Sequence, residues 1–296
     1  MFNINNINVS SLNVKNLVNR LIGKLKGRAA NFENEAGTKS ILKALQVSNE
    51  CGNVLLLIAG QSNARGSTNG TVPAEAYLNT AIPSTFIWTG SAFAQLQINV
   101  NNGTSTDSHG IELNFGYLSQ LSRTGNVYIV KVTEGSTGFR DNKWNDGDAN
   151  YNTLVTDANA AIANLTSAGT QFHFAGLYWN QGEKDTGGSN AEAEAYETNL
   201  SNFVTALRGD ITGGSNMRFM FTRLATYYTT RTTTNDSNRA RAVVVRGKQD
   251  AANSSISNSF LIDQDDLQHH GDQVHANSAS QNILASRVFD IIKDLL

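Results

Sequence analysis

A serine stands directly after the longest apolar run of the chain, in the tetrapeptide Gly60-Gln61-Ser62-Asn63. The run itself, Val54 to Ala59, has the composition of a buried strand. A serine at the carboxyl end of a strand can be held exposed on a tight turn, with backbone N–H groups nearby that bind an oxyanion. A serine that merely caps a following helix would explain the tetrapeptide if it stood alone. Its partners elsewhere in the chain therefore decide whether Ser62 is a nucleophile.

A carboxylate and an imidazole, Asp272 and His275, lie three residues apart just before the last helical pattern. A loop after the last strand would return them to the sheet edge that carries Ser62. Asp272 could then hold His275 in the tautomer that accepts the serine proton and stabilise the imidazolium that forms. His269 and His270 are competing bases, but their surroundings are typical of a solvated loop. We therefore predict Ser62 as the nucleophile, His275 as its general base and Asp272 as the partner of His275.

Two further segments follow predicted strands and could supply oxyanion donors. In the segment 179–185, Gln181 offers a side-chain N–H, and in the segment 134–138, Gly135 could present its backbone N–H without a Cβ in the way. Glu183 and Asp185 could instead be the paired carboxylates of a glycosidase. A carboxylate that orients neighbouring backbone is the role we favour for Glu183.

Short apolar runs alternate with longer helical patterns from residue 53 onward, which is typical of a parallel sheet covered on both faces. The predicted strands are Val54–Ala59, Val127–Val132, Gln171–Trp179, Arg218–Leu224 and Phe260–Asp263. The predicted helices are Ile111–Arg123, Asn150–Ser167, Ala191–Leu207, Arg239–Asn253 and Ser278–Leu295. This order predicts an α/β protein, a three-layer α/β/α sandwich with a five-stranded parallel sheet.

Residues 65–110 interrupt this alternation with a short β-like run, Thr85–Trp88, and a polar stretch. A long excursion after the first strand is expected near the carboxyl edge of the sheet, where open α/β folds bind ligands. We expect it, together with the polar stretch Tyr227–Asn238, to shape the substrate site.

Taken in order, four segments resemble the conserved blocks of the SGNH hydrolases, in the branch of sialate O-acetylesterases and the family 6 carbohydrate esterases with acetylxylan esterase activity. The segments are Gly60-Gln61-Ser62-Asn63, Gly135-Ser136 with Trp144, Trp179-x-Gln181-Gly182-Glu183-x-Asp185, and Asp272-x-x-His275. Four ordered blocks over roughly residues 53–293 are far more specific than one short motif. Two positions differ from the usual pattern: Glu-Gly-Ser replaces a double glycine, and Ala-Asn follows His275. Neither difference removes a catalytic group.

The resemblance implies a flavodoxin-like fold and a serine esterase that removes O-acetyl groups from polysaccharide or sialic acid without a metal or cofactor. Ser62 would attack, His275 would be the base and Asp272 its partner. The oxyanion donors would be the N–H of Ser62, the N–H of Gly135 and the Gln181 side chain. Gln61, Asn63 and Glu183 would support this site.

Composition excludes several other classes of protein. The formal net charge is −2 over 296 residues, and Lys and Arg form no dense cluster beyond residues 20–28, so nucleic acid is not an expected partner. The single cysteine, Cys51, cannot form an intrachain disulfide, and no Cys/His spacing indicates a structural zinc site. The longest apolar run is too short to span a bilayer, and no secretory signal is visible. The compartment is not determined by these features.

The segment 1–50 differs from the rest of the chain. Ten of its residues are Asn, and apolar residues recur at helical spacing within Val14–Leu25. We predict an N-terminal appendage with an amphipathic helix, followed by an esterase domain at residues 51–296. The appendage could pack on the domain, or it could serve docking, oligomerisation or virion assembly. The alternative function is therefore a virion or cell-surface structural protein whose hydrolase domain mainly binds or trims glycan.

Overall fold

The computed structural model describes residues 52–293, except residues 69, 72, 105 and 123–124. The predicted appendage, its amphipathic helix and Cys51 lie outside the described residues, so the docking, oligomerisation and virion hypotheses stay predictions. In the described part of the chain, no helix is both long and apolar enough to cross a membrane.

The centre of the protein is one seven-stranded sheet with the order β3-β2-β4-β1-β5-β6-β7. All neighbouring pairs are parallel except β2 and β3, which are antiparallel. The strands are β1 (Asn53–Gly60), β2 (Thr85–Trp88), β3 (Phe93–Gln95), β4 (Val127–Thr133), β5 (Phe172–Asn180), β6 (Phe219–Thr222) and β7 (Ser259–Ile262).

The α/β class and the five predicted strands agree with the structure, but the prediction of a five-stranded, wholly parallel sheet is wrong. The excursion adds β2, which pairs with β4, and β3, which pairs with β2. These strands have four and three residues, too few for a period-two pattern to stand out. The sheet is therefore mixed and extends beyond its predicted edge.

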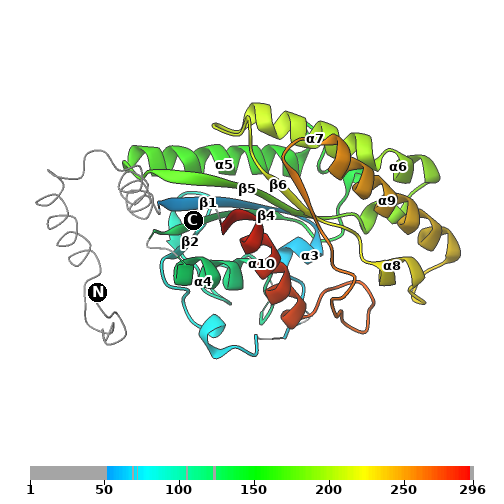
Figure 1. Ribbon diagram of the computed structural model, residues 1–296, viewed down its shortest axis with the longest axis horizontal. Coiled ribbons are helices and arrows are strands. Elements are labelled where there is room, and N and C mark those ends of the chain that lie inside the picture. Colours follow the sequence, from blue (N-terminus) through cyan, green and yellow to red (C-terminus); the bar gives the residue numbers. More distant parts are fainter. Residues whose placement is uncertain (1–51, 69, 72, 105, 123–124, 294–296) are drawn as a thin grey trace, which may run out of the picture. The chain divides into compact units, whose positions relative to one another are not determined.

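Helices cover both faces of the sheet, as Figure 1 shows: α5, α7 and α9 lie on one face, and α4 and α10 lie on the other. The longer helices are α4 (Glu112–Ser122), α5 (Ala149–Ser167), α7 (Tyr196–Asp210), α9 (Asp236–Ser255) and α10 (Ser278–Ile292). Shorter helices are α3 (Ser62–Arg65), α6 (Asn190–Glu194) and α8 (Thr226–Thr230), with 3₁₀ turns at Ala76–Asn79, Phe139–Asp141 and Lys184–Gly187. The predicted helix Ala191–Leu207 is divided at Ala195 into α6 and α7.

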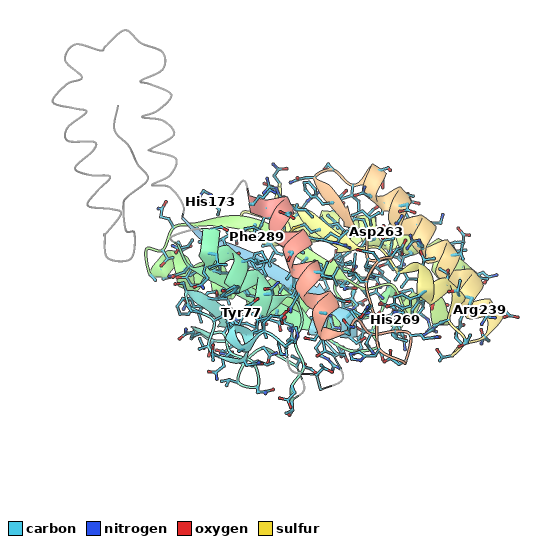
Figure 2. All side chains as sticks on the ribbon, turned by 60° about the horizontal axis from the view of Figure 1, so that its bottom comes forward. Tyr77, His173, Arg239, Asp263, His269 and Phe289 are labelled. Carbon is cyan, nitrogen blue, oxygen red and sulfur yellow. The ribbon has the colours of Figure 1, made fainter. Side chains whose placement is uncertain are left out.

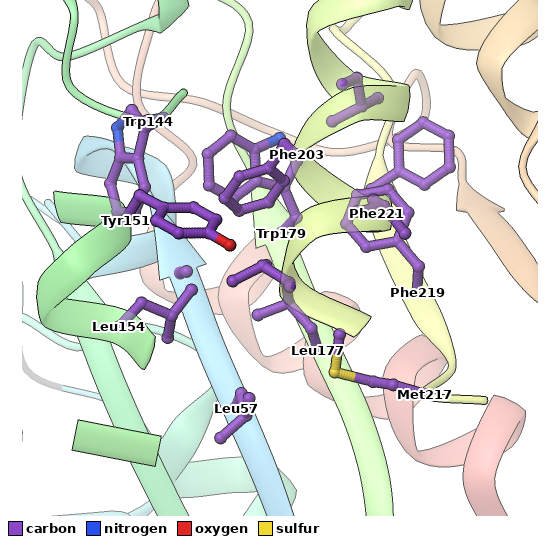
Figure 3. Close-up of a cluster of buried hydrophobic side chains, with 14 of the residues drawn as sticks. Leu57, Trp144, Tyr151, Leu154, Leu177, Trp179, Phe203, Met217, Phe219 and Phe221 are labelled. Carbon is purple, nitrogen blue, oxygen red and sulfur yellow. The ribbon is translucent and has the colours of Figure 1, made fainter. Parts of the chain in front are cut away.

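The central strand β1 separates two apolar cores, because successive side chains of a strand point to opposite faces. Leu55, Leu57 and Ala59 pack toward α5, α7 and α9, whereas Val54, Leu56 and Ile58 pack toward α4 and α10. The first core contains a group of large aromatic side chains, seen in Figure 3, among them Trp144, Trp179, Tyr151 and Phe203. All residues of β1 from Val54 onward are buried, which fixes the strand and the turn that follows it.

The parallel strands present their carboxyl ends at one end of the domain. Figure 2 shows His269, in the loop before α10, and Arg239, on α9, toward one end, and His173, at the start of β5, toward the other. The segments after β1, β4, β5 and β7 therefore emerge on the His269 side. β1 also lies where the strand order reverses direction, which is where open α/β sheets bind ligands.

Candidate active site

Ser62, His275 and Asp272 form a continuous hydrogen-bonded chain. The Ser62 Oγ lies 2.9 Å from His275 Nε2, and His275 Nδ1 lies 2.7 Å from Asp272 Oδ2. The carboxylate partner assigns the proton to Nδ1, so Nε2 is free to accept the serine proton. Burial alone would raise the pKa of Asp272, but the hydrogen bonds from His275 and from two backbone N–H groups lower it to about 2. This arrangement can activate a serine hydroxyl as a nucleophile.

Gly60 holds the turn that places Ser62 at the start of α3. Its φ is +132°, and a Cβ at this position would lie 2.3 Å from the carbonyl oxygen of Asn180 on β5. Only glycine allows this conformation and this close approach. Gln61 then continues in extended conformation, and its N–H donates to the same Asn180 carbonyl. The turn is thus anchored to the neighbouring strand.

Asn63 fastens the loop that carries His275 to the helix that carries Ser62. Its Nδ2 donates to the Val274 carbonyl at 3.1 Å, and its Oδ1 accepts from the Ala276 N–H at 3.0 Å. These two backbone groups flank His275 on either side. The Asn63 side chain therefore fixes the backbone on both sides of His275.

Glu183 lies beneath this clamp, following β5. Its Oε1 accepts from Asn63 Nδ2 at 2.6 Å, while its Oε2 is buried without a hydrogen-bond partner in the described structure. The residue is only 6% exposed, and burial raises the pKa of the carboxyl group. Glu183 is thus in direct contact with Asn63.

The Gln181 amide is surrounded by protein acceptors. Its Nε2 donates to Asp185 Oδ2 at 2.6 Å and lies 3.2 Å from both Gln61 Oε1 and the Thr137 carbonyl. Its Oε1 accepts from the Tyr196 hydroxyl at 3.0 Å, which fixes the orientation of the amide. Because protein acceptors already surround the amide nitrogen, Gln181 would reach an oxyanion only by exchanging one of the 3.2 Å contacts. The short bond to Asp185 lies within the loop after β5, and the two longer contacts connect this loop to the segments after β1 and β4.

The backbone N–H groups of Ser62 and Gly135 have no protein acceptor among the described residues. Gly135 follows β4, and a Cβ there would lie 3.2 Å from the Arg65 guanidinium, so glycine leaves room for the cation to pack against the loop. The next residue, Ser136, has a φ of +59°.

A cleft of about 390 Å³ opens over the Ser62 hydroxyl. Its lining includes Ser62, His275, Ser136, Glu183, Tyr228 and Arg231. The stretch 227–238 therefore contributes to the cleft as expected, whereas no described residue of 65–110 lines it. Part of the 65–110 segment forms β2 and β3, and Arg65 packs against Gly135 beside the cleft.

The competing residues lie in other positions. His269 stacks on the ring of Tyr227 at 3.4 Å between centroids, and burial lowers the pKa of its imidazole. Asp185, the second carboxylate of the glycosidase hypothesis, bonds to Gln181 and accepts from the Arg140 N–H. Asp185 is not among the residues that line the cleft. In the described ranges, no group of three or more His, Cys, Asp or Glu side chains could hold a metal ion.

Comparison with known proteins now decides the family. A model of the carbohydrate esterases described as sialic acid-specific acetylesterases matches residues 52–293. The chain belongs to this family. This carbohydrate esterase is accordingly an ester hydrolase. No curated protein sequence matches the esterase.

Solved structures resemble the esterase in fold. NanS matches with a TM-score of 0.65 at 16% identity, covering 82% of this chain and 98% of NanS. A protein from Arabidopsis thaliana gives the same TM-score and identity, covering 83% of this chain and 100% of the plant protein. A carbohydrate acetylesterase from Xanthomonas citri gives a TM-score of 0.54 at 15% identity, covering 83% of this chain and 57% of that one. At these identities the likeness shows the fold alone.

Proposed function

We propose that the protein is a serine esterase that hydrolyses O-acetyl groups on carbohydrate, either acetylated polysaccharide or sialic acid, through an acetyl-enzyme intermediate. The observation that carries the proposal is the hydrogen-bonded chain from Ser62 through His275 to Asp272 at the base of an open cleft. Family membership supports an acetylated carbohydrate as the substrate.

In the first step, Ser62 Oγ attacks the acetyl carbonyl while its proton moves to His275 Nε2. Asp272 stabilises the imidazolium through the 2.7 Å bond to Nδ1. His275 then donates the proton to the sugar oxygen as the C–O bond to the acetyl group breaks. The sugar leaves with a free hydroxyl group, and the acetyl group remains on Ser62.

In the second step, a water molecule replaces the sugar. His275 removes a proton from this water, the resulting hydroxide attacks the acetyl-enzyme, and the proton returns to Ser62 Oγ as acetate leaves. The N–H groups of Ser62 and Gly135 stabilise the oxyanion in both steps. One such donor contributes roughly 2.7–4 kcal/mol to transition-state stabilisation.

Two serine substitutions test the proposal. Ser62→Ala should abolish acetate release from 4-nitrophenyl acetate and from acetylated xylan or O-acetylated sialic acid. Ser136→Ala is the matched control, because Ser136 lines the same cleft and has no hydrogen bond to His275 in the described structure. The proposal fails if Ser62→Ala keeps the wild-type rate, or if Ser136→Ala loses activity in its place.

A further inference from the structure

A buried charge pair, Lys131 and Glu112, lies on the sheet face covered by α4 and α10. Lys131 follows Ile129 on β4 by two residues, so its side chain continues the same face of the strand, and Glu112 begins α4. The Lys131 side chain is 2% exposed, the Glu112 side chain is 0% exposed, and Lys131 Nζ lies 2.9 Å from Glu112 Oε2. Because taking two charges out of water is costly, such a pair is a poor way to fill a core unless its charges hold other groups in place.

The ammonium group of Lys131 also contacts two backbone carbonyls. Its Nζ donates to the Arg65 carbonyl at 2.8 Å and to the Asn102 carbonyl at 2.8 Å. Arg65 is the last residue of α3, and carbonyl groups at the end of a helix have no partner within the helix. Together with Glu112, these carbonyls give the three N–H donors of the ammonium group three acceptors. Lys131 thus ties β4 to α3, the helix that begins with Ser62.

Glu112 fixes the backbone on which α3 ends. Its Oε1 accepts from the Gly110 N–H at 3.0 Å. Gly66, directly after α3, has a φ of +93°, and the Gly110 nitrogen leaves no room for a Cβ at this position. The end of α3 is therefore held twice, through its last carbonyl by Lys131 and through the backbone it packs on by Glu112.

The two segments that Lys131 connects carry two of the proposed oxyanion donors. The Ser62 N–H lies at the start of α3, and the Gly135 N–H follows β4. The Arg65 guanidinium packs against Gly135, where a Cβ would lie 3.2 Å from it. Lys131 thus holds the backbone of Arg65 while the Arg65 side chain contacts the Gly135 loop.

We propose that Lys131 is a positioning residue, which sets the separation of the Ser62 and Gly135 N–H groups through Arg65. This inference rests on the proposed function and concerns the transition state of that reaction. An oxyanion donor is effective only at about 2.7–3.1 Å from the oxygen that becomes charged. A displacement of about 1 Å can lower a rate about a hundredfold. Loss of the tie should therefore lower kcat and leave KM nearly unchanged.

A double substitution, Lys131→Met with Glu112→Gln, removes the tie without leaving a buried charge unpaired. Met fills the space of the lysine stem, and Gln keeps an oxygen for the Gly110 N–H. With 4-nitrophenyl acetate, kcat should fall roughly 10- to 100-fold and KM should stay within about threefold. The inhibition constant of phenylboronic acid should rise by a similar factor, because its tetrahedral adduct with Ser62 places an oxygen at the same donors.

The inhibition constant separates positioning from folding. A fraction of unfolded enzyme would lower kcat but would leave the inhibition constant of the remaining active sites unchanged. Leu165→Ala is the matched control, because Leu165 is buried near the end of α5 in the core on the other sheet face, and its truncation destabilises the fold away from the site. In this control the inhibition constant and KM should stay within about twofold of the wild-type values.

Arg65→Lys tests the second half of the tie and serves if the double variant does not fold. It keeps a positive charge but removes the planar group that packs against Gly135. The inhibition constant of phenylboronic acid should rise about three- to tenfold.

An inhibition constant equal to that of the wild type, in the folded double variant or in Arg65→Lys, would overturn the inference. In that case Ser62-dependent acetate release by the wild type continues, so the proposed esterase function stands. If the wild type releases no more acetate than Ser62→Ala, both the inference and the proposed function fail.

Discussion

Asp272→Asn should inactivate the enzyme without unfolding it, for a reason that its hydrogen bonds specify. Asp272 Oδ1 accepts from the N–H groups of Val274 and His275 at 2.9 and 3.1 Å. An asparagine must keep its oxygen there, because backbone N–H groups cannot donate to an amide NH₂. The NH₂ then faces His275 Nδ1 and donates to it. The imidazole proton moves to Nε2, which can no longer accept the proton of Ser62.

The expected loss follows from this change of tautomer. Tautomer reversal in a Ser-His-Asp site lowers kcat by about ten-thousandfold, which corresponds to about 5 kcal/mol. The assay is steady-state hydrolysis of 4-nitrophenyl acetate, with thermal unfolding to confirm that the variant folds. Asp263→Asn is a suitable control, since Asp263 pairs with Arg223 at the surface. A loss of less than about tenfold in Asp272→Asn would refute the tautomer argument.

Asp272→Asn should also change how the stability of the protein depends on pH. The pKa of Asp272 is lowered to about 2 in the folded protein. A carboxyl group whose pKa is lowered by folding stabilises the folded protein at pH values above its unfolded-state pKa, which is near 4. This contribution is lost as the pH falls toward about 2. The wild type should therefore lose more thermal stability than Asp272→Asn between about pH 5 and pH 2. Parallel pH profiles would show that the folded protein does not lower this pKa.

Substitutions at three further residues test the surroundings of the site. Glu183→Gln keeps an oxygen that can accept from Asn63, so its rate of 4-nitrophenyl acetate hydrolysis should stay within about tenfold of the wild-type rate. Glu183→Ala removes this acceptor and should lower the rate further. Equal losses of rate in the two variants would contradict a supporting role for Glu183. Gln181→Leu should lower stability by roughly 1–3 kcal/mol in thermal unfolding, because the buried Asp185 Oδ2 loses the donor that Gln181 supplies. The kcat of Gln181→Leu should fall less than about a hundredfold, and a larger loss would support Gln181 as an oxyanion donor. Gly60→Ala should either lower the yield of folded protein or lower its stability by at least roughly 1–3 kcal/mol. An unchanged melting temperature would show that the turn before Ser62 does not require glycine.

The convergence of Ser62 and His275 could be predicted because it depends on order along the chain. Polar segments that follow buried strands meet at one sheet edge, so Ser62 after β1 and His275 after β7 were expected to converge. The apolar run of β1 and the glycine before Gln61 gave a strong local pattern. These features can be recognised in the sequence because backbone geometry and burial restrict which residues can occupy the positions.

Other parts of the site depend on contacts that leave no local pattern. The pairing of β2 with β4 arises from tertiary packing of a four-residue run. The partners of Gln181 come from segments 120 and 44 residues away, so its amide direction could not be inferred from its place after β5.

The clamp made by Asn63 has a consequence for how activity appears during refolding. It joins two parts of the chain 211 and 213 residues apart, and the Ser62–His275 bond spans the same distance. Contacts of such separation close late, after helices and neighbouring strands have formed. Hydrolysis should therefore recover more slowly than helical circular dichroism after dilution from denaturant. The enzyme's own turnover would then report the final docking of its most distant segments.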